Sequence, residues 1–188
     1  PTILTLDWDA PASQGGSSIS AYKVYRGSSS GFTLDSGSLI TTITDTSVTE
    51  YANTGLTADT RYYYSVLATN TQGDGTQADA DAYTLLNAPT SLTATGASVS
   101  QINLAWTAPT GANNLDGYKI EYNNGSWQTL VADTGSTGTT YSHTSLSTGN
   151  SFTYRVSGLF GSLAGLTSNT AQGSTYAVPS AITDLSGV

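Results

Sequence analysis

Several residue types on which functional sites depend are scarce or missing in this sequence. It has no Cys and no Met, one His, and five Lys and Arg against 13 Asp and Glu, a formal net charge of −8. Without cysteine there is no disulfide and no thiol chemistry, and a single His excludes His-rich metal sites. The acidic balance argues against nucleic acid as a partner, because phosphate binding needs clustered cations. No apolar run is long enough to span a membrane, so no membrane insertion is expected in this segment.

Hydroxyl side chains take the place of charges. The 188 residues include 26 Ser and 32 Thr, while only 10% are charged. This composition is typical of secreted or cell-surface proteins, so we expect an extracellular location. The 12 Tyr, 3 Trp and 3 Phe are too many for a disordered linker. The sequence begins at Pro1 without an initiator Met, which indicates a processed product or a fragment of a longer chain.

Apolar residues alternate with polar ones, which predicts strands rather than helices. Leu4, Leu6 and Trp8 fall on one face of the first such segment. Turn residues recur every 8–12 positions, a spacing typical of an all-β sandwich or barrel.

The sequence then repeats itself with a unit of about one small β-sandwich. Leu4–Pro11 returns as Ile102–Pro109, and Tyr22–Val24 returns as Tyr118–Ile120. The Asn-Ala-Pro segment at Pro89 is echoed at Pro179. A third set recurs with identical internal spacing: Leu56, Tyr62, Tyr64 and Val66 as Leu146, Phe152, Tyr154 and Val156.

These motifs resemble those of fibronectin type III domains. The family pattern has a Trp followed by Ala-Pro, then Tyr-x-Val, then Leu-x-x-x-x-x-Tyr-x-Tyr-x-Val, and both copies carry it. The resemblance implies an all-β fold of two tandem seven-stranded Greek-key sandwiches. We assign residues 1–86 to a first domain with strands B to G, 87–176 to a second with strands A to G, and 177–188 to an orphan strand A.

The motif residues are expected to fill the cores or to fix the chain between strands. They are Trp8, Tyr22, Tyr62, Tyr64, Trp106, Tyr118, Phe152 and Tyr154. Tyr62 matches the family's tyrosine corner, whose hydroxyl caps backbone in the preceding turn. The second copy departs here, since Phe152 has no hydroxyl, and by this criterion alone the second domain would be the less stable.

The ends of the sequence are out of phase with the repeat, because the first copy lacks a strand A. One explanation is that a longer array has been cut in mid-domain. The other is strand exchange, in which 177–188 inserts into the first domain of a neighbouring chain with Ile182 and Leu185 as anchors. Such a head-to-tail contact does not close on itself and therefore builds a filament.

No constellation of catalytic residues is recognisable, so we predict no enzyme activity, no metal and no cofactor. His143, the counterpart of Asn53, is interpreted as a surface turn residue. The pairs Asp7/Asp9 and Asp79/Asp81 should each point to one face of a strand, toward solvent.

A candidate binding face lies on the outward side of the first domain's C, F and G strands. It would carry Lys23, Tyr25, Arg61, Tyr63 and Tyr83, with exposed tyrosines able to stack on sugars or on a partner. The alternative is ordinary cross-strand pairing on a solvated sheet. The second domain has Lys119, Glu121 and Arg155 there without the tyrosines. Asn124 begins the one N-glycosylation sequon.

Together these features predict a non-catalytic extracellular structural or adhesive module. Its expected partners are other domains of the same chain or identical subunits, and it could assemble into a filament by strand exchange. The alternative is an accessory or carbohydrate-binding module of a secreted polysaccharide-active enzyme, with glycans as partners.

Overall fold

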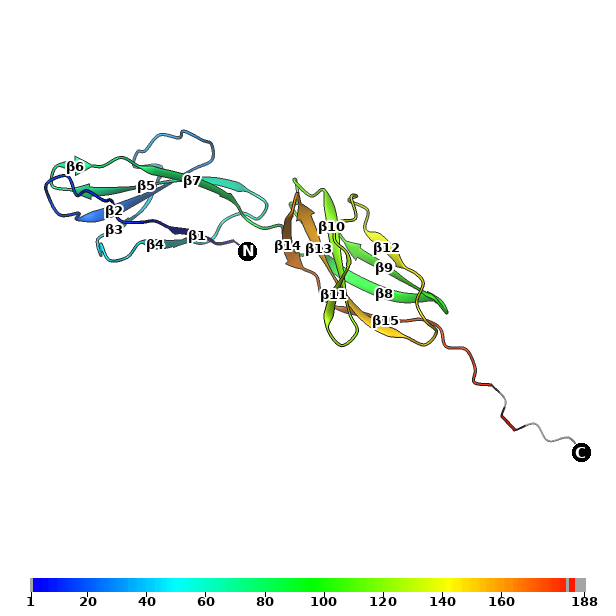
Figure 1. The fold of residues 1–188 in the computed structure, drawn as a ribbon. Coiled ribbons are helices and arrows are strands. Elements are labelled where there is room, and N and C mark those ends of the chain that lie inside the picture. Colours follow the sequence, from blue (N-terminus) through cyan, green and yellow to red (C-terminus); the bar gives the residue numbers. More distant parts are fainter. Residues whose placement is uncertain (1, 182, 185–188) are drawn as a thin grey trace, which may run out of the picture. The chain divides into compact units, whose positions relative to one another are not determined.

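The chain folds into two compact units, Pro1–Leu85 (unit 1) and Leu86–Val188 (unit 2). The computed structural model describes residues 2–181 and 183–184, and these contain strands and turns but no helix. Accordingly, the described residues contain no helix able to cross a membrane. Figure 1 shows that each unit is built of two layers of strands.

Unit 1 places its alternating segments in two sheets. A larger sheet has the order β3-β2-β5-β6 with β7 also paired to β5, and a smaller one consists of β1 and β4. The strands are β1 (Leu4–Asp7), β2 (Ala21–Gly27), β3 (Leu39–Ile43), β4 (Glu50–Asn53), β5 (Arg61–Asn70), β6 (Gly73–Asp74) and β7 (Ala78–Tyr83).

Unit 2 repeats this arrangement with one strand more. Its larger sheet has the order β11-β10-β13-β14 with β15 also paired to β13, and its smaller sheet has the order β12-β9-β8. The strands are β8 (Thr90–Ser98), β9 (Gln101–Thr107), β10 (Gly117–Asn123), β11 (Trp127–Val131), β12 (Thr140–His143), β13 (Ser151–Phe160), β14 (Leu163–Thr167) and β15 (Ala171–Ser174).

The predicted motif residues of unit 2 form a closed core between its sheets. Tyr118 and Tyr154 are 0% exposed, and Phe152 is also buried. Trp106 is 6% exposed and meets Tyr118 edge to face, with ring centroids 5.0 Å apart. Large aromatic side chains therefore fill a substantial part of the unit 2 core, beside aliphatic residues such as Ile102 and Leu104.

The core of unit 1 is more open than that of unit 2. Tyr22 and Tyr64 are each 2% exposed, but Trp8 and Val66 are only half-buried, whereas Val156 is 0% exposed. The difference follows from the strand count, because β8 covers one edge of the unit 2 sandwich and contacts β15. Among the described residues of unit 1, no strand occupies the equivalent position, as predicted.

The tyrosine corner forms in unit 1 as expected. The backbone N–H of Thr57 donates a hydrogen bond of 3.0 Å to the hydroxyl of Tyr62. This bond fixes the turn before β5 to the strand itself. At the matching position of unit 2, Phe152 retains the apolar contact without the hydroxyl.

Candidate binding faces

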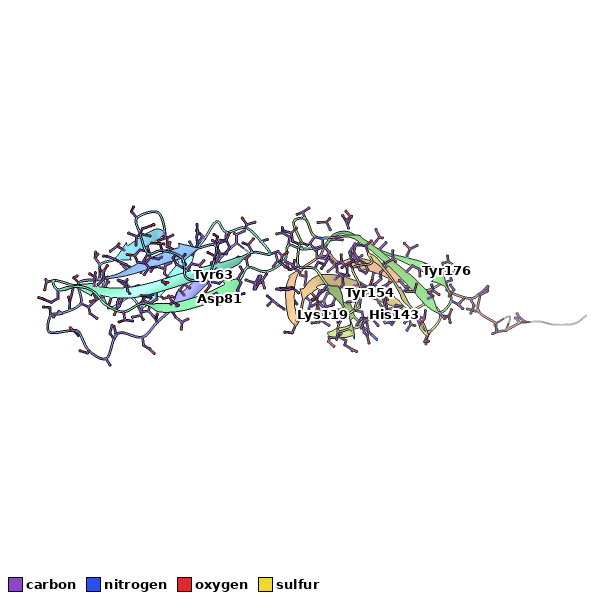
Figure 2. All side chains as sticks on the ribbon, turned by 90° about the horizontal axis from the view of Figure 1, so that it is seen from above. Tyr63, Asp81, Lys119, His143, Tyr154 and Tyr176 are labelled. Atoms are coloured by element: carbon purple, nitrogen blue, oxygen red, sulfur yellow. The ribbon has the colours of Figure 1, made fainter. Side chains whose placement is uncertain are left out.

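The larger sheet of unit 1 carries its charges in pairs on the outward side. Lys23 on β2 lies 2.8 Å from a carboxylate oxygen of Asp74, and Arg61 on β5 lies 2.7 Å from Asp81 on β7. Figure 2 shows Tyr63 and Asp81 beside each other on this face. The guanidinium of Arg61 lies 5.1 Å from the ring centroid of Tyr63 and 5.6 Å from that of Tyr83.

These pairs stabilise the charged forms of their members. The hydrogen bond to Asp74 raises the pKa of Lys23, and the same bond lowers the pKa of Asp74. The hydrogen bond to Asp81 raises the pKa of Arg61. Lys23, Asp74 and Arg61 therefore stay ionised near neutral pH.

Tyr25 was predicted to be exposed on this face, and that prediction is wrong. Tyr25 does lie on the outward side of β2, but it is only 6% exposed. The connection 28–38 folds over this end of the face, where Phe32 packs so closely on Gly27 that a Cβ there would overlap its ring. Residues of this connection and of β5 and β7 enclose a small cleft of about 150 Å³, lined by Phe32, Tyr63 and Asp79 among others.

The equivalent face of unit 2 centres on one carboxylate. Glu121 lies 2.8 Å from Lys119 and 2.8 Å from Arg155, and its side chain is only 12% exposed. Burial alone would raise the pKa of Glu121, but the hydrogen bonds from Arg155 and Lys119 outweigh it, so the pKa is lowered. The group is a fixed anion between two cations, on a sheet rather than in a cleft.

One aromatic residue on this face was missed by the sequence reasoning. Trp127 on β11 is 36% exposed, and the guanidinium of Arg155 lies over its ring at 4.1 Å from the centroid. Trp127 pairs with Asn123 on β10, which pairs with Thr153 on β13. The alternation of β11 could have revealed it, but the prediction considered only the neighbouring strands.

His143 was interpreted as a surface turn residue, and this is also wrong. It is the last residue of β12, half-buried, with Nδ1 2.9 Å from the hydroxyl oxygen of Tyr154 (Figure 2). Burial lowers the pKa of His143 and raises that of Tyr154. Asn53 is its counterpart in unit 1, where its side-chain oxygen accepts hydrogen bonds from Tyr64 and Arg26, each 2.9 Å long.

The remaining candidate residues lie apart from any cluster. Asp7 and Asp9 are exposed as predicted, while the Asp79 carboxylate accepts a 2.5 Å hydrogen bond from Ser65. Within the described part of the chain, no group of three or more His, Asp or Glu could hold a metal ion. Asn124 is exposed in the turn between β10 and β11. Ile182 and Leu185 lie outside the described residues.

Two tandem sandwiches, each with its charges paired on an open sheet face, define a modular β-protein. The chain belongs to the fibronectin type III family, whose domain model matches residues 1–82 and 87–174. This match confirms the all-β fold and the tandem organisation that the sequence motifs predicted.

Known proteins similar to this chain fall into two kinds. It is 31% identical over 132 residues to exoglucanase B of Cellulomonas fimi, covering 64% of this chain and 11% of that protein. It is 31% identical over 165 residues to chitinase A1 of Niallia circulans, covering 81% and 21%. It is 30% identical over 169 residues to neogenin of Rattus norvegicus, covering 85% and 12%. The chain thus spans between 11% and 21% of the length of these relatives.

Two solved structures are also similar to this chain. A two-domain fibronectin type III segment of chicken tenascin is 18% identical, with a TM-score of 0.48 over 91% of each chain. The FN1–FN3 domains of chicken CNTN1 are 21% identical, with a TM-score of 0.47 over 93% of this chain and 63% of that one.

Proposed function

We propose that this chain is a non-catalytic structural and adhesive module of an extracellular or cell-surface protein. The observation that supports it best is the pairing of the charged side chains. Lys23, Arg61, Lys119 and Arg155 each hold a carboxylate on an open face. Groups held in this way fix the surface of a sheet and are unsuited to general acid–base work, which needs a pKa near the working pH.

The location can be tested with antibodies raised against the 188-residue chain. Cells that produce the protein are labelled intact and after permeabilisation. We expect full labelling of intact cells or recovery of the antigen from the medium. Labelling that needs permeabilisation would contradict an extracellular role.

We further propose that copies of the chain join head to tail by donating the segment 177–188 to unit 1 of a neighbour. The support is the uncovered edge of unit 1, where β1 pairs with β4 alone, whereas β9 in unit 2 pairs on both sides. An added strand would satisfy backbone groups at that edge and cover half-buried side chains such as Trp8. Repetition of this contact would build a filament.

A second candidate function is carbohydrate binding as an accessory module, and Trp127 favours it. An exposed indole beside the side chains of Asn123 and Thr153 offers a stacking surface with hydrogen-bonding groups next to it. The similarity to an exoglucanase and a chitinase suggests glucan and chitin fragments as probes.

Calorimetry with oligosaccharides of glucose and of N-acetylglucosamine tests this second function. If this function is correct, Trp127→Ala abolishes sugar binding. Tyr176→Ala is the control, because it removes an aromatic side chain that is 55% exposed and lies away from Trp127, and it should leave sugar binding unchanged. In unit 1, Tyr63→Ala is the corresponding test, since Tyr25 is buried. Absence of binding by the unaltered chain at millimolar sugar would reject the function.

A further inference from the structure

The turn between β10 and β11 holds a pair of residues that occurs nowhere else in the chain. Asn124 is followed by Gly125, whereas every other Asn precedes a residue with a side chain. A side chain hinders approach to the backbone nitrogen of its own residue, and glycine has none. The surroundings of Gly125 are open as well, because nothing lies within 4 Å of the point that a Cβ would occupy.

The side chain of Asn124 is exposed and has room to turn toward this nitrogen. Elsewhere, the side-chain amides of Asn70, Asn87 and Asn169 each donate a hydrogen bond to a backbone carbonyl oxygen. In the described part of the chain, no such bond restrains the side chain of Asn124. The turn therefore presents a carboxamide next to an unobstructed backbone N–H.

We infer that Asn124 is a site of spontaneous covalent modification, at which the side-chain amide is lost without an enzyme. The backbone nitrogen of Gly125 attacks the side-chain carbonyl carbon of Asn124 and forms a new carbon–nitrogen bond. The bond from that carbon to the side-chain nitrogen breaks, and ammonia leaves with the equivalent of the proton that Gly125 gives up. The product is a succinimide, a five-membered ring within the backbone.

Water then opens the ring in one of two ways. Addition to the former side-chain carbonyl carbon restores the normal backbone and leaves an aspartyl residue. Addition to the backbone carbonyl carbon leaves an isoaspartyl residue, in which the chain runs through the former side chain and is longer by one methylene group. Either product adds a carboxylate, and no oxidant or reductant is needed. The nitrogen that leaves is the one that an N-linked glycan at this sequon would occupy, so the two modifications of Asn124 exclude each other.

The isoaspartyl product changes the surface beside the turn. The turn 124–126 joins β10 to β11, and the pair next to it is Asn123 with Trp127. A longer backbone in so short a turn cannot keep this pair in register, so the pair opens. Trp127 then loses its position against Arg155, whose guanidinium lies 4.1 Å from the centroid of its ring. The modification is thus a slow and irreversible change in the face that carries Trp127.

Incubation of the 188-residue chain in neutral buffer, followed by peptide mapping, tests the inference. The tryptic peptide 120–155 carries both Asn124 and Asn150, an exposed Asn that Ser151 follows. Tandem mass spectrometry should show replacement of the amide by a carboxyl group at least tenfold faster at Asn124 than at Asn150. The rate should rise with hydroxide concentration, because a base must remove the proton of the Gly125 N–H. Equal rates at the two positions overturn the inference.

The same incubation in urea tests the part that the fold plays. Because the turn leaves Asn124 exposed and Gly125 unobstructed, the folded chain should react at no less than a tenth of the rate of the unfolded chain. A slower reaction of the folded chain would show that the turn protects Asn124, and it would contradict the inference.

Asn124→Gln is the matched variant, since it keeps the amide but could close only a six-membered ring. It should lose at least nine-tenths of the reaction at this position, and a variant that reacts as fast as Asn124 would indicate direct hydrolysis instead. Gly125→Ala is less suitable, because Gly125 has a φ of +98°, where alanine is strained.

Nuclear magnetic resonance measures the effect on the neighbouring surface. As the modification proceeds, the indole N–H signal of Trp127 should split in step with the change in mass, while the signals of Trp8 and Trp106 stay in place. A Trp127 signal that does not move would contradict the opening of its pair with Asn123. These measurements involve neither sugar binding nor self-association, so the modification and the proposed functions can fail separately.

Discussion

The tyrosine corner offers a reciprocal test at the scale of one hydroxyl group. Tyr62→Phe removes the acceptor of the Thr57 N–H and should destabilise unit 1 by about 1 kcal/mol. Phe152→Tyr places a hydroxyl at the matching corner of unit 2 and should stabilise that unit by up to about 1 kcal/mol, if its hydroxyl reaches the backbone of Ser147. Urea unfolding of the 188-residue chain, with Trp8 and Trp106 as probes of the two units, measures both. If neither substitution changes the free energy of unfolding of its unit, the hydrogen bond of the tyrosine corner contributes nothing to stability.

The pair His143 and Tyr154 makes unit 2 sensitive to mild acid. Burial lowers the pKa of His143 from its ordinary value of 6.5, so the unfolded chain takes up a proton before the folded one does. The stability of unit 2 is therefore complete above about pH 7 and falls as the pH drops through about 6.5. Asp74 and Glu121, whose pKa values are lowered, remain ionised over this window.

His143→Asn isolates that effect, because Asn53 makes the corresponding hydrogen bond to Tyr64 in unit 1. The variant should lose the change in unit 2 stability between pH 7.5 and pH 5 while unit 1 behaves as before. If unit 2 of the variant loses as much stability at pH 5 as unit 2 of the unaltered chain, other titratable groups cause the acid sensitivity. Urea unfolding at the two pH values provides the measurement.

At the scale of the strand, β8 decides which unit is the more stable. The missing hydroxyl of Phe152 costs unit 2 about 1 kcal/mol. Fully burying an exposed Val or Leu side chain contributes about 1.5–3 kcal/mol, so each one that unit 1 leaves half-buried forgoes about half of that, and there are several. We therefore expect unit 2 to unfold at the higher urea concentration, the reverse of what the tyrosine corner alone predicts. Amide hydrogen exchange of β9 and β1 gives an independent ranking, and slower exchange in β1 would contradict it.

The sequence predicted the strands better than it predicted what covers them. Alternation and the repeat place Tyr22, Tyr64, Tyr118 and Tyr154 in the cores, because a period of two assigns each residue to a face. That period cannot show that Tyr25, on the outward side of its strand, is buried, since its burial depends on how a connection such as 28–38 folds back over the sheet. His143 was misjudged for a related reason: its partner, Tyr154, lies across the sandwich in another sheet.

Electrostatic repulsion governs association at the scale of the whole molecule. Each chain carries a formal charge of −8, and the proposed head-to-tail contact is a strand added at the edge of unit 1 rather than an ion pair. Like-charged copies repel one another, and salt screens that repulsion over a Debye length that shortens from about 30 Å at 0.01 M to about 8 Å at 0.15 M. Raising the salt concentration over this range should therefore strengthen self-association severalfold. Sedimentation velocity at the two salt concentrations measures the effect. Association that weakens with salt would instead indicate that ion pairs between copies hold the assembly together.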